Sequence, residues 1–343
     1  MTEVSPPRLA AYIAGRLPAA RDVRVDDLSR IHGGASRETY RFRLRYNDAK
    51  AGEVERRLIL RRDPAASLIE TDRKTEFFAY RAFGGTSVPV PEMIWLEEEA
   101  GPLDRPFFIA EEIVGCEASA AELLVEPYRS KAETIGTRKW SILGEIARAD
   151  PAALGLTEIM TAPAPEACWR RELGHWEAVI DADAVAPQPI MRAAIRRLRA
   201  APPPPAQRIA VVHGDFRSGN FLYDTEGEIH GVLDWEMAHL GDPLEDLAWS
   251  LNRVWCWGGD DRRGGLLPRD RAIAIWERAS SFSVSPNALA WWELFSCVKG
   301  QAIWASSAKA WSGGANRDPV MAFTAWRMTN AQDRAALELM HRL

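Results

Sequence analysis

Apolar and charged residues alternate over short stretches in the first third of the chain. From Tyr40 to Tyr46 the sequence YRFRLRY places aromatic and aliphatic side chains on one face and arginines on the other, which is the pattern of a half-buried strand. A turn beginning at Asn47 and an apolar stretch at 58–61 predict the second strand of an antiparallel hairpin. The same reasoning predicts one helix and two more strands, at 71–83, 93–96 and 107–113.

The pattern changes after Gly115, where apolar residues recur at helical spacing. Helices are expected over 119–125, 130–148, 166–180 and 189–200. Short strands are expected at 209–212, 221–223 and 229–233, and the sequence from Pro243 onward is helical again. The predicted fold class is therefore α+β, with a small β-rich lobe over residues 1–112 and a large, mainly helical lobe over residues 113–343.

Composition and charge narrow the range of partners. The chain has 343 residues and a net charge of −5, which argues against general nucleic-acid binding. No stretch approaches the length of an apolar membrane span, and no basic segment followed by an apolar run opens the sequence. The 4 cysteines are far apart and lack the spacing of a zinc site. We expect a cytoplasmic protein with no nucleic-acid or membrane partner, and the sequence leaves its oligomeric state open.

One segment, HGDFRSGN at residues 213–220, has the side chains that phosphoryl transfer requires. That reaction needs a carboxylate for the attacking hydroxyl and oxygen ligands that hold Mg²⁺ against the phosphates. Asp215 and Asn220 stand five residues apart, and Asp234 follows 14 residues after Asn220. Because the intervening strands predict a hairpin turning at 224–227, Asp234 should return to the side of Asn220. We expect Asp215 to be the catalytic carboxylate and Asn220 and Asp234 to be metal ligands.

The motif HGDxxxxN, followed by a hairpin and an aspartate, resembles the aminoglycoside phosphotransferase and choline kinase-like family. GDPLEDLA at 241–248 is also similar to the family's sequence after the metal-binding aspartate, and 106–115 and 150–156 resemble the kinase-like domain fused to acyl-CoA dehydrogenases. The resemblance covers nearly the whole chain and implies a protein kinase-like fold of two lobes. It also implies an ATP-dependent phosphotransferase that acts on a hydroxyl of a small molecule, with Mg²⁺ and ATP, or with GTP in place of ATP.

By this resemblance the nucleotide belongs to the first lobe. Glycines allow backbone N–H groups to approach phosphate oxygens closely, and a turn between the first two strands would cover the phosphates. Backbone groups at the connection between the lobes would face the adenine. The residues expected in these two roles are Gly33, Gly34 and Ser36 for the phosphates and Glu111 and Ile113 for the adenine.

The family's strand lysine is replaced by Arg61. Strand alternation places Arg61 on the same face as Ile59, whereas Arg62 points to the opposite face and is expected to be solvated. We expect Arg61 to contact phosphate oxygens while it pairs with Glu76 on the following helix, because a planar guanidinium can serve both partners.

Two residues are expected to support the catalytic loop. His213 is predicted to hydrogen-bond within the loop rather than to take part in the chemistry. Asp246 braces the loop if the resemblance holds, and the alternative is an exposed carboxylate on a helix. Asp242, which precedes Pro243, is predicted to cap that helix.

The phosphate acceptor is expected in the helical lobe, where 13 of the 14 tryptophans lie. Aromatic walls suit an apolar alcohol, a sugar face or a quaternary ammonium group, although tryptophans at helical spacing also form cores. The segment 255–265 combines aromatics, carboxylates and glycines. Its candidate substrate residues are Trp255, Trp257, Asp260 and Asp261.

Two other functions remain open from the sequence. A protein kinase would need a long activation segment, yet only seven residues separate Asp234 from Asp242. A non-catalytic or weakly active nucleotide-binding protein would fit the loss of the strand lysine. Against it, Asp215, Asn220 and Asp234 are all present.

Overall fold

The computed structural model describes residues 4–31, 38–63, 73–256, 258 and 260–341. It divides into two compact units, one made of residues 1–84 with 91–114 and the other of residues 85–90 with 115–343. The sequence predicted one boundary, at 112–113. The structure adds that 85–90 belongs to the second unit, where Val232 N donates a hydrogen bond to Pro89 O at 2.8 Å. The units are described separately below.

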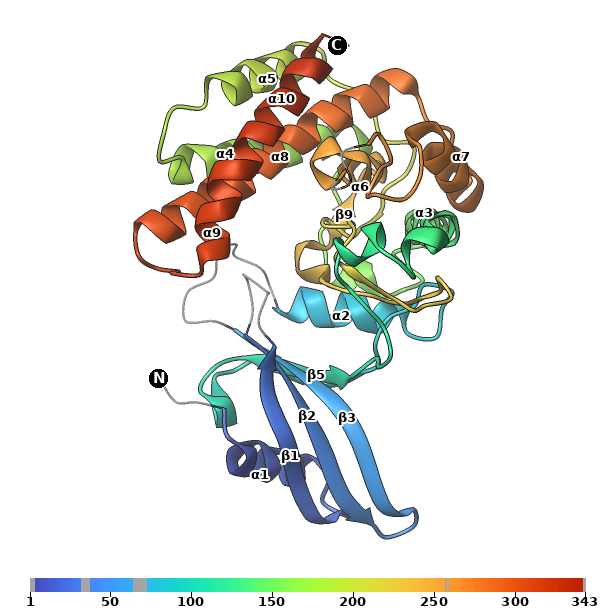
Figure 1. The fold of residues 1–343 in the computed structure, drawn as a ribbon, viewed down its shortest axis with the longest axis vertical. Coiled ribbons are helices and arrows are strands. Elements are labelled where there is room, and N and C mark those ends of the chain that lie inside the picture. Colours follow the sequence, from blue (N-terminus) through green and yellow to red (C-terminus); the bar gives the residue numbers. More distant parts are fainter. Residues whose placement is uncertain (1–3, 32–37, 64–72, 257, 259, 342–343) are drawn as a thin grey trace. The chain divides into compact units, whose positions relative to one another are not determined.

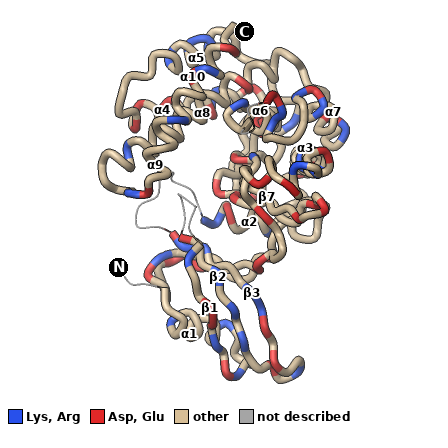
Figure 2. The backbone as a smooth tube through the Cα atoms, viewed as in Figure 1, with Lys and Arg blue, Asp and Glu red and all other residues tan. Residues whose placement is uncertain are grey.

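The first unit is built on a five-stranded antiparallel sheet in the order β1-β2-β3-β5-β4 (Figure 1). Its strands are β1 (Arg21–Ile31), β2 (Glu38–Asp48), β3 (Gly52–Arg62), β4 (Met93–Glu97) and β5 (Phe107–Glu111). The predicted hairpin is β2 with β3, in which Phe42 lies opposite Leu58. Charged residues of both signs follow one another along these two strands (Figure 2).

One face of this sheet is covered by α1 (Pro6–Arg16), which follows the helical spacing of its apolar residues. Leu9 and Ile13 of α1 pack with Phe42, Leu44 and Leu60 of the sheet in one apolar core. The second helix of this unit, α2 (Arg73–Phe83), begins at the end of the undescribed segment 64–72 and packs against β4.

The second unit is a bundle of helices around α8 (Pro286–Ser312), against which α4, α5, α6 and α10 pack. Because α8 is surrounded, apolar residues occur on all its sides, and the predicted helical region after Pro243 is confirmed. A second pair, α3 with α7, packs beside it. The helices are α3 (Ala132–Arg148), α4 (Cys168–Asp183), α5 (Pro189–Ala200), α6 (Leu244–Leu251), α7 (Arg269–Ser280), α9 (Pro319–Phe323) and α10 (Thr329–Met340), with a π-helical turn at Thr324–Met328.

Two short strand pairs frame the loop 213–220 in this unit. β6 (Ala210–Val212) pairs with β9 (His239–Gly241), and β7 (Phe221–Tyr223) pairs with β8 (Ile229–Val232). The hairpin of β7 and β8 confirms the prediction. The helix predicted over 119–125 is wrong, because only the 3-10 turn Glu122–Leu124 forms there. This segment is instead tied to β7, since Glu117 N donates to Tyr223 O at 2.8 Å.

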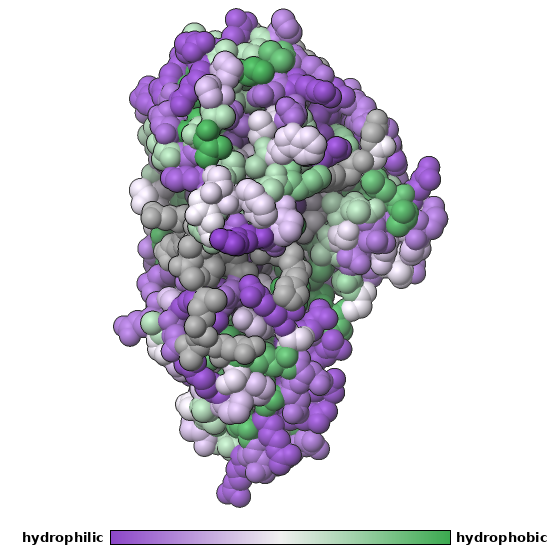
Figure 3. Space-filling view, turned by 60° about the vertical axis from the view of Figure 1, so that its left-hand side comes forward, coloured by the Kyte–Doolittle hydropathy of each residue, from purple (hydrophilic) through white to green (hydrophobic). Residues whose placement is uncertain are grey.

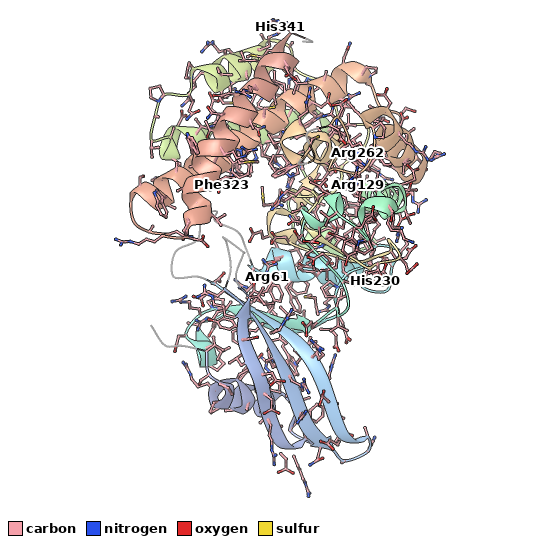
Figure 4. The ribbon with its side chains drawn as sticks, viewed as in Figure 1. Arg61, Arg129, His230, Arg262, Phe323 and His341 are labelled. Carbon is pink, nitrogen blue, oxygen red and sulfur yellow. The ribbon has the colours of Figure 1, made fainter. Side chains whose placement is uncertain are left out.

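The surface drawn in Figure 3 is largely polar, with apolar groups between the charged ones. Several large apolar side chains that are exposed lie around α9, which carries the labelled Phe323 in Figure 4: Trp311, Val320, Phe323 and Trp326. Across the ranges that the structure describes, no helix combines the length and the apolar character that crossing a bilayer demands.

Candidate active site

The catalytic-loop candidate begins with a buried histidine that cannot act as an acid at neutral pH. His213 Nδ1 accepts the backbone N–H of Asp215 at 3.1 Å, so the proton must be on Nε2, which donates to Leu233 O at 2.9 Å. Burial lowers the pKa of His213 to about 4. The ring is therefore neutral and holds the loop against the segment that follows β8, as expected of a supporting residue.

Asp246, on α6, accepts hydrogen bonds from the backbone N–H groups of His213 at 2.6 Å and Gly214 at 2.9 Å. It is only 3% exposed, so the alternative of an exposed helix carboxylate is wrong. Gly214 has φ +87°, and a Cβ there would lie 2.4 Å from Met237 O, so no larger residue fits this turn. Burial raises the pKa of Asp246 to about 6.

Both oxygens of the Asp215 carboxylate accept hydrogen bonds. Oδ2 accepts from Asn220 Nδ2 at 2.7 Å, while Oδ1 accepts from Trp249 Nε1 at 2.7 Å and from Arg217 Nε at 3.2 Å. Burial raises the pKa of Asp215, the Arg217 charge opposes the rise and the charge of Asp234 adds to it. The carboxylate is thus held in one orientation by three donors.

The orientation of the Asn220 side-chain amide follows from its hydrogen bonds. Its Nδ2 donates to the main-chain oxygen of Asp215 at 2.8 Å as well as to that residue's carboxylate. Because both partners are acceptors, the nitrogen must face them and Oδ1 must face away. This oxygen fits a Mg²⁺ ligand, since Mg²⁺ prefers oxygen donors.

The β7–β8 hairpin brings Asp234 to the same end of the loop. Phe221 lies opposite Val232, and Leu233 N donates to Asn220 O at 2.8 Å. Asp234 is the next residue and adopts a left-handed conformation (φ 69°, ψ 52°). For a residue other than glycine this conformation costs free energy, and such residues cluster at active sites. A carboxylate and an amide oxygen from this hairpin form a donor set that fits Mg²⁺.

In the first unit the ion pair expected of Arg61 is present. Arg61 (Figure 4) donates from Nη1 to Glu76 Oε1 at 2.7 Å, and the Glu76 side chain is completely buried. The prediction that Arg62 is solvated is wrong: its Nε donates to Glu38 Oε2 at 2.9 Å and its Nη1 to Leu103 O at 3.0 Å. Arg62 lies on the face of β3 that α1 and the core cover, so it is buried with its partners.

Glu111 ends β5, and Ile113 follows it. The Glu111 backbone N–H donates to Glu92 O at 2.9 Å, and its side chain accepts from Arg56 Nε at 3.1 Å. Contacts of Glu111 and Ile113 with adenine stay predictions. Gly33, Gly34, Ser36 and Trp257 lie outside the residues that the structure describes.

Among the substrate candidates, Trp255 lies in the core. It is 3% exposed and packs with Trp249, Trp304 and Met328, while the Arg217 guanidinium lies 4.9 Å from the centre of its ring. The two carboxylates are at the surface. Asp260 pairs with Arg262 at 2.8 Å, and Asp261 pairs with Arg263 at 3.3 Å.

The predicted N-cap is off by one residue: Pro243, and not Asp242, is the N-cap of α6, although Asp242 Oδ1 accepts the backbone N–H of Leu244 at 3.0 Å. The sequence did not predict the other contacts that hold the loop 213–220. Trp249 stands three residues after Asp246, a spacing that shares one helix face, so a signal for its position existed. Lys299 Nζ donates to Gly214 O at 2.7 Å. Lys299 is 85 residues from Gly214 in the sequence, and no motif indicated this contact.

The sequence of this chain is similar to a known enzyme family and to segments of larger proteins. The phosphotransferase enzyme family matches residues 27–282. Acyl-CoA dehydrogenase family member 10 of Mus musculus is 30% identical over 246 residues, which are 71% of this chain and 22% of that protein. Acyl-CoA dehydrogenase family member 11 of Gallus gallus is 29% identical over 198 residues, 56% of this chain and 24% of that protein. The chain thus spans about a quarter of the length of these relatives.

Three solved structures are examples of proteins that share this fold. A Ralstonia eutropha protein provisionally named an aminoglycoside phosphotransferase has a TM-score of 0.74 at 19% identity, with 98% of each chain covered. A thermostable mutant of aminoglycoside phosphotransferase APH(4)-Ia, in a ternary complex with AMP-PNP and hygromycin B, has a TM-score of 0.59 at 18% identity, covering 95% of this chain and 98% of that one. The GDP complex of aminoglycoside 2'-phosphotransferase-IIIa has a TM-score of 0.61 at 12% identity, with 99% of each chain covered.

Proposed function

Because this chain belongs to the phosphotransferase enzyme family, we propose that it transfers the γ-phosphoryl group of ATP to a hydroxyl group of a small molecule. The observation that carries the proposal is the Asp215 carboxylate, which is oriented by two side-chain donors of its own loop and by Trp249 of α6. Complexes of structural neighbours with AMP-PNP, with hygromycin B and with GDP support a nucleotide and a small acceptor as its ligands.

In the proposed reaction the hydroxyl oxygen of the acceptor attacks the γ-phosphorus, and Asp215 accepts the proton of that hydroxyl. The bond between the γ-phosphorus and the oxygen that bridges it to the β-phosphate breaks, and ADP leaves. A buried carboxylate with a raised pKa is suited to that role. Asn220 and Asp234 would hold Mg²⁺, which neutralises phosphate charge when bound. Arg61, oriented by Glu76, would contact phosphate oxygens.

The acceptor class is a hydroxylated small molecule rather than a protein. Only seven residues separate Asp234 from Asp242, which leaves no room for the long activation segment of a protein kinase. The retention of Asp215, Asn220 and Asp234 favours catalysis over a non-catalytic nucleotide-binding role. The alternative phosphoryl donor is GTP in place of ATP.

The test is a screen of hydroxylated compounds with Mg·ATP, in which ADP release and a new phosphate ester are both followed by ³¹P NMR. Asp215→Asn should lower kcat by about a thousandfold or more while Mg·ATP still binds, because the carboxylate is the proton acceptor. Asp270→Asn is the matched control, since Asp270 is 97% exposed on α7. A turnover by Asp215→Asn that is close to that of the control would contradict the assignment.

A further inference from the structure

Trp249 donates a hydrogen bond directly to the proposed catalytic carboxylate. It lies on α6, 34 residues from Asp215, and its indole Nε1 is 2.7 Å from Asp215 Oδ1. The indole N–H is a donor only, so the direction of this bond is fixed. A donor that meets an ionised carboxylate at this distance makes a stronger bond than one between neutral groups.

The ring of Trp249 is itself held in place. It packs edge-on against Trp255, with ring centres 5.2 Å apart, and the Lys299 ammonium lies 5.3 Å from its centre. The same ammonium donates to Gly214 O at 2.7 Å. Lys299 therefore contacts both the donor ring and the peptide group that precedes Asp215, so the two ends of the Trp249–Asp215 bond are fixed by one buried residue.

The donors are divided unequally between the two carboxylate oxygens. Oδ1 accepts from Trp249 and Arg217, whereas Oδ2 accepts only from Asn220 among the described residues. A carboxylate oxygen has about two acceptor positions. Oδ1 is thus saturated and Oδ2 retains a position for one more proton donor.

We infer that Trp249 is a positioning residue: its indole N–H occupies Oδ1 of Asp215 and thereby leaves Oδ2 to receive the proton of the acceptor hydroxyl. The inference rests on the proposed function. Trp249 is buried behind Asp215 and acts through it, and the bond sets the rotation of the carboxylate about its Cβ–Cγ axis. Without the bond, Oδ1 keeps only the longer contact with Arg217 at 3.2 Å, so the carboxylate is held less firmly in its productive orientation.

The first test detects the bond without any turnover. In a ¹H–¹⁵N spectrum of the deuterated full chain, with indole signals assigned through the backbone, the Trp249 indole proton should lie downfield and move upfield in Asp215→Asn, where the charged acceptor is lost. Trp304 is the internal control, because it packs in the same cluster and its indole N–H has no hydrogen-bond partner among the described residues. An unmoved Trp249 signal would overturn the inference. This arm needs no variant of Trp249, so a misfolded Trp249→Phe protein does not prevent it.

The second test uses Mg·ATP with water as the phosphoryl acceptor and compares Trp249→Phe with Trp304→Phe. Trp249→Phe should lower kcat about 10- to 100-fold, the scale of a misplaced catalytic group, with the KM for ATP within twofold of wild type. Trp304→Phe removes the same N–H from the same cluster and should leave kcat unchanged. A merely structural role of Trp249 would instead change both parameters or affect both variants alike.

The outcomes separate the two proposals. Hydrolysis that requires Asp215 but does not respond to Trp249→Phe overturns the positioning role and leaves the proposed function intact. Wild-type hydrolysis no faster than that of Asp215→Asn, together with no phosphorylated product in the compound screen, overturns the proposed function and this inference with it.

Discussion

Replacing Lys299 by methionine removes a buried charge that contacts the loop 213–220. Lys299 Nζ donates to Glu245 Oε1 at 2.8 Å and to Gly214 O at 2.7 Å, and both charged side chains are 1% exposed. Methionine has a similar volume and no charge, so packing is conserved while both hydrogen bonds are lost. Glu245 then keeps one partner, His239, whose Nε2 lies 3.1 Å from Glu245 Oε2.

The size of the effect follows from burial. Removing one partner of a buried ion pair costs about 3–5 kcal/mol, and the remaining contact with His239 places Glu245 at the lower end, about 3 kcal/mol. The carbonyl of Gly214 loses a donor in a buried position, which adds about 1 kcal/mol. A total near 4 kcal/mol corresponds to a drop in Tm of about 8 °C, at about 2 °C per kcal/mol for a chain of this size.

The assay is urea unfolding and calorimetry of Lys299→Met beside Lys309→Met. Lys309 is on the same helix and pairs with Asp183 at 2.7 Å, and the Lys309 side chain is 56% exposed. Loss of this exposed ion pair should therefore lower the free energy of unfolding by no more than about 1 kcal/mol. Adding Glu245→Gln to Lys299→Met should restore part of the stability, because it removes the uncompensated charge. If Lys299→Met unfolds within 1 kcal/mol of Lys309→Met, the reasoning is refuted.

Three further outcomes are expected. Asp234→Ala should abolish Mg²⁺-dependent ATP binding measured by calorimetry, whereas Asp270→Ala should bind normally; equal affinities would remove Asp234 from the metal site. Arg61→Ala should raise the KM for ATP, while Arg62→Ala should mainly lower Tm because that side chain is buried; the reverse pattern would mean that the strand register toward the nucleotide is misassigned. Burial alone would lower the pKa of His239, but neighbouring carboxylates raise it from 6.5 to about 9. The charged His239 should therefore stabilise the folded protein fully below pH 6.5, and this contribution should vanish as the pH rises through 9. The Tm difference between wild type and His239→Gln should therefore shrink over that interval, and a constant difference would contradict the assignment.

Local patterns in the sequence predicted the elements that a short segment specifies by its own alternation or turn. The alternation from Tyr40 to Tyr46 predicted β2 because one face of that strand is covered by a core. Two short apolar stretches separated by a turn at 224–227 predicted the hairpin of β7 and β8, which carries Asp234 back toward Asn220. In each case the pattern that specifies the element lies within one short segment, wherever its packing partners come from.

The predictions failed where a distant segment decides the environment. Arg62 was expected to be solvated, but Glu38 and Leu103 come to it from other elements. The contacts of Trp249 and Lys299 with the catalytic loop cross 34 and 85 residues. A single lysine in an apolar helix gives no indication of the carbonyl that it will meet.

Gly214 is one of the two glycines of the loop 213–220, the residue type with the greatest intrinsic backbone freedom, and hydrogen bonds restrict it on both sides. Its N–H donates to Asp246 at 2.9 Å and its carbonyl accepts from Lys299 at 2.7 Å. Neither bond can open while α6 and α8 remain packed, so the amide protons of His213 and Gly214 should exchange with deuterium only when the whole helical unit unfolds. Exchange at these two amides would then report the global stability of the unit from within its catalytic loop.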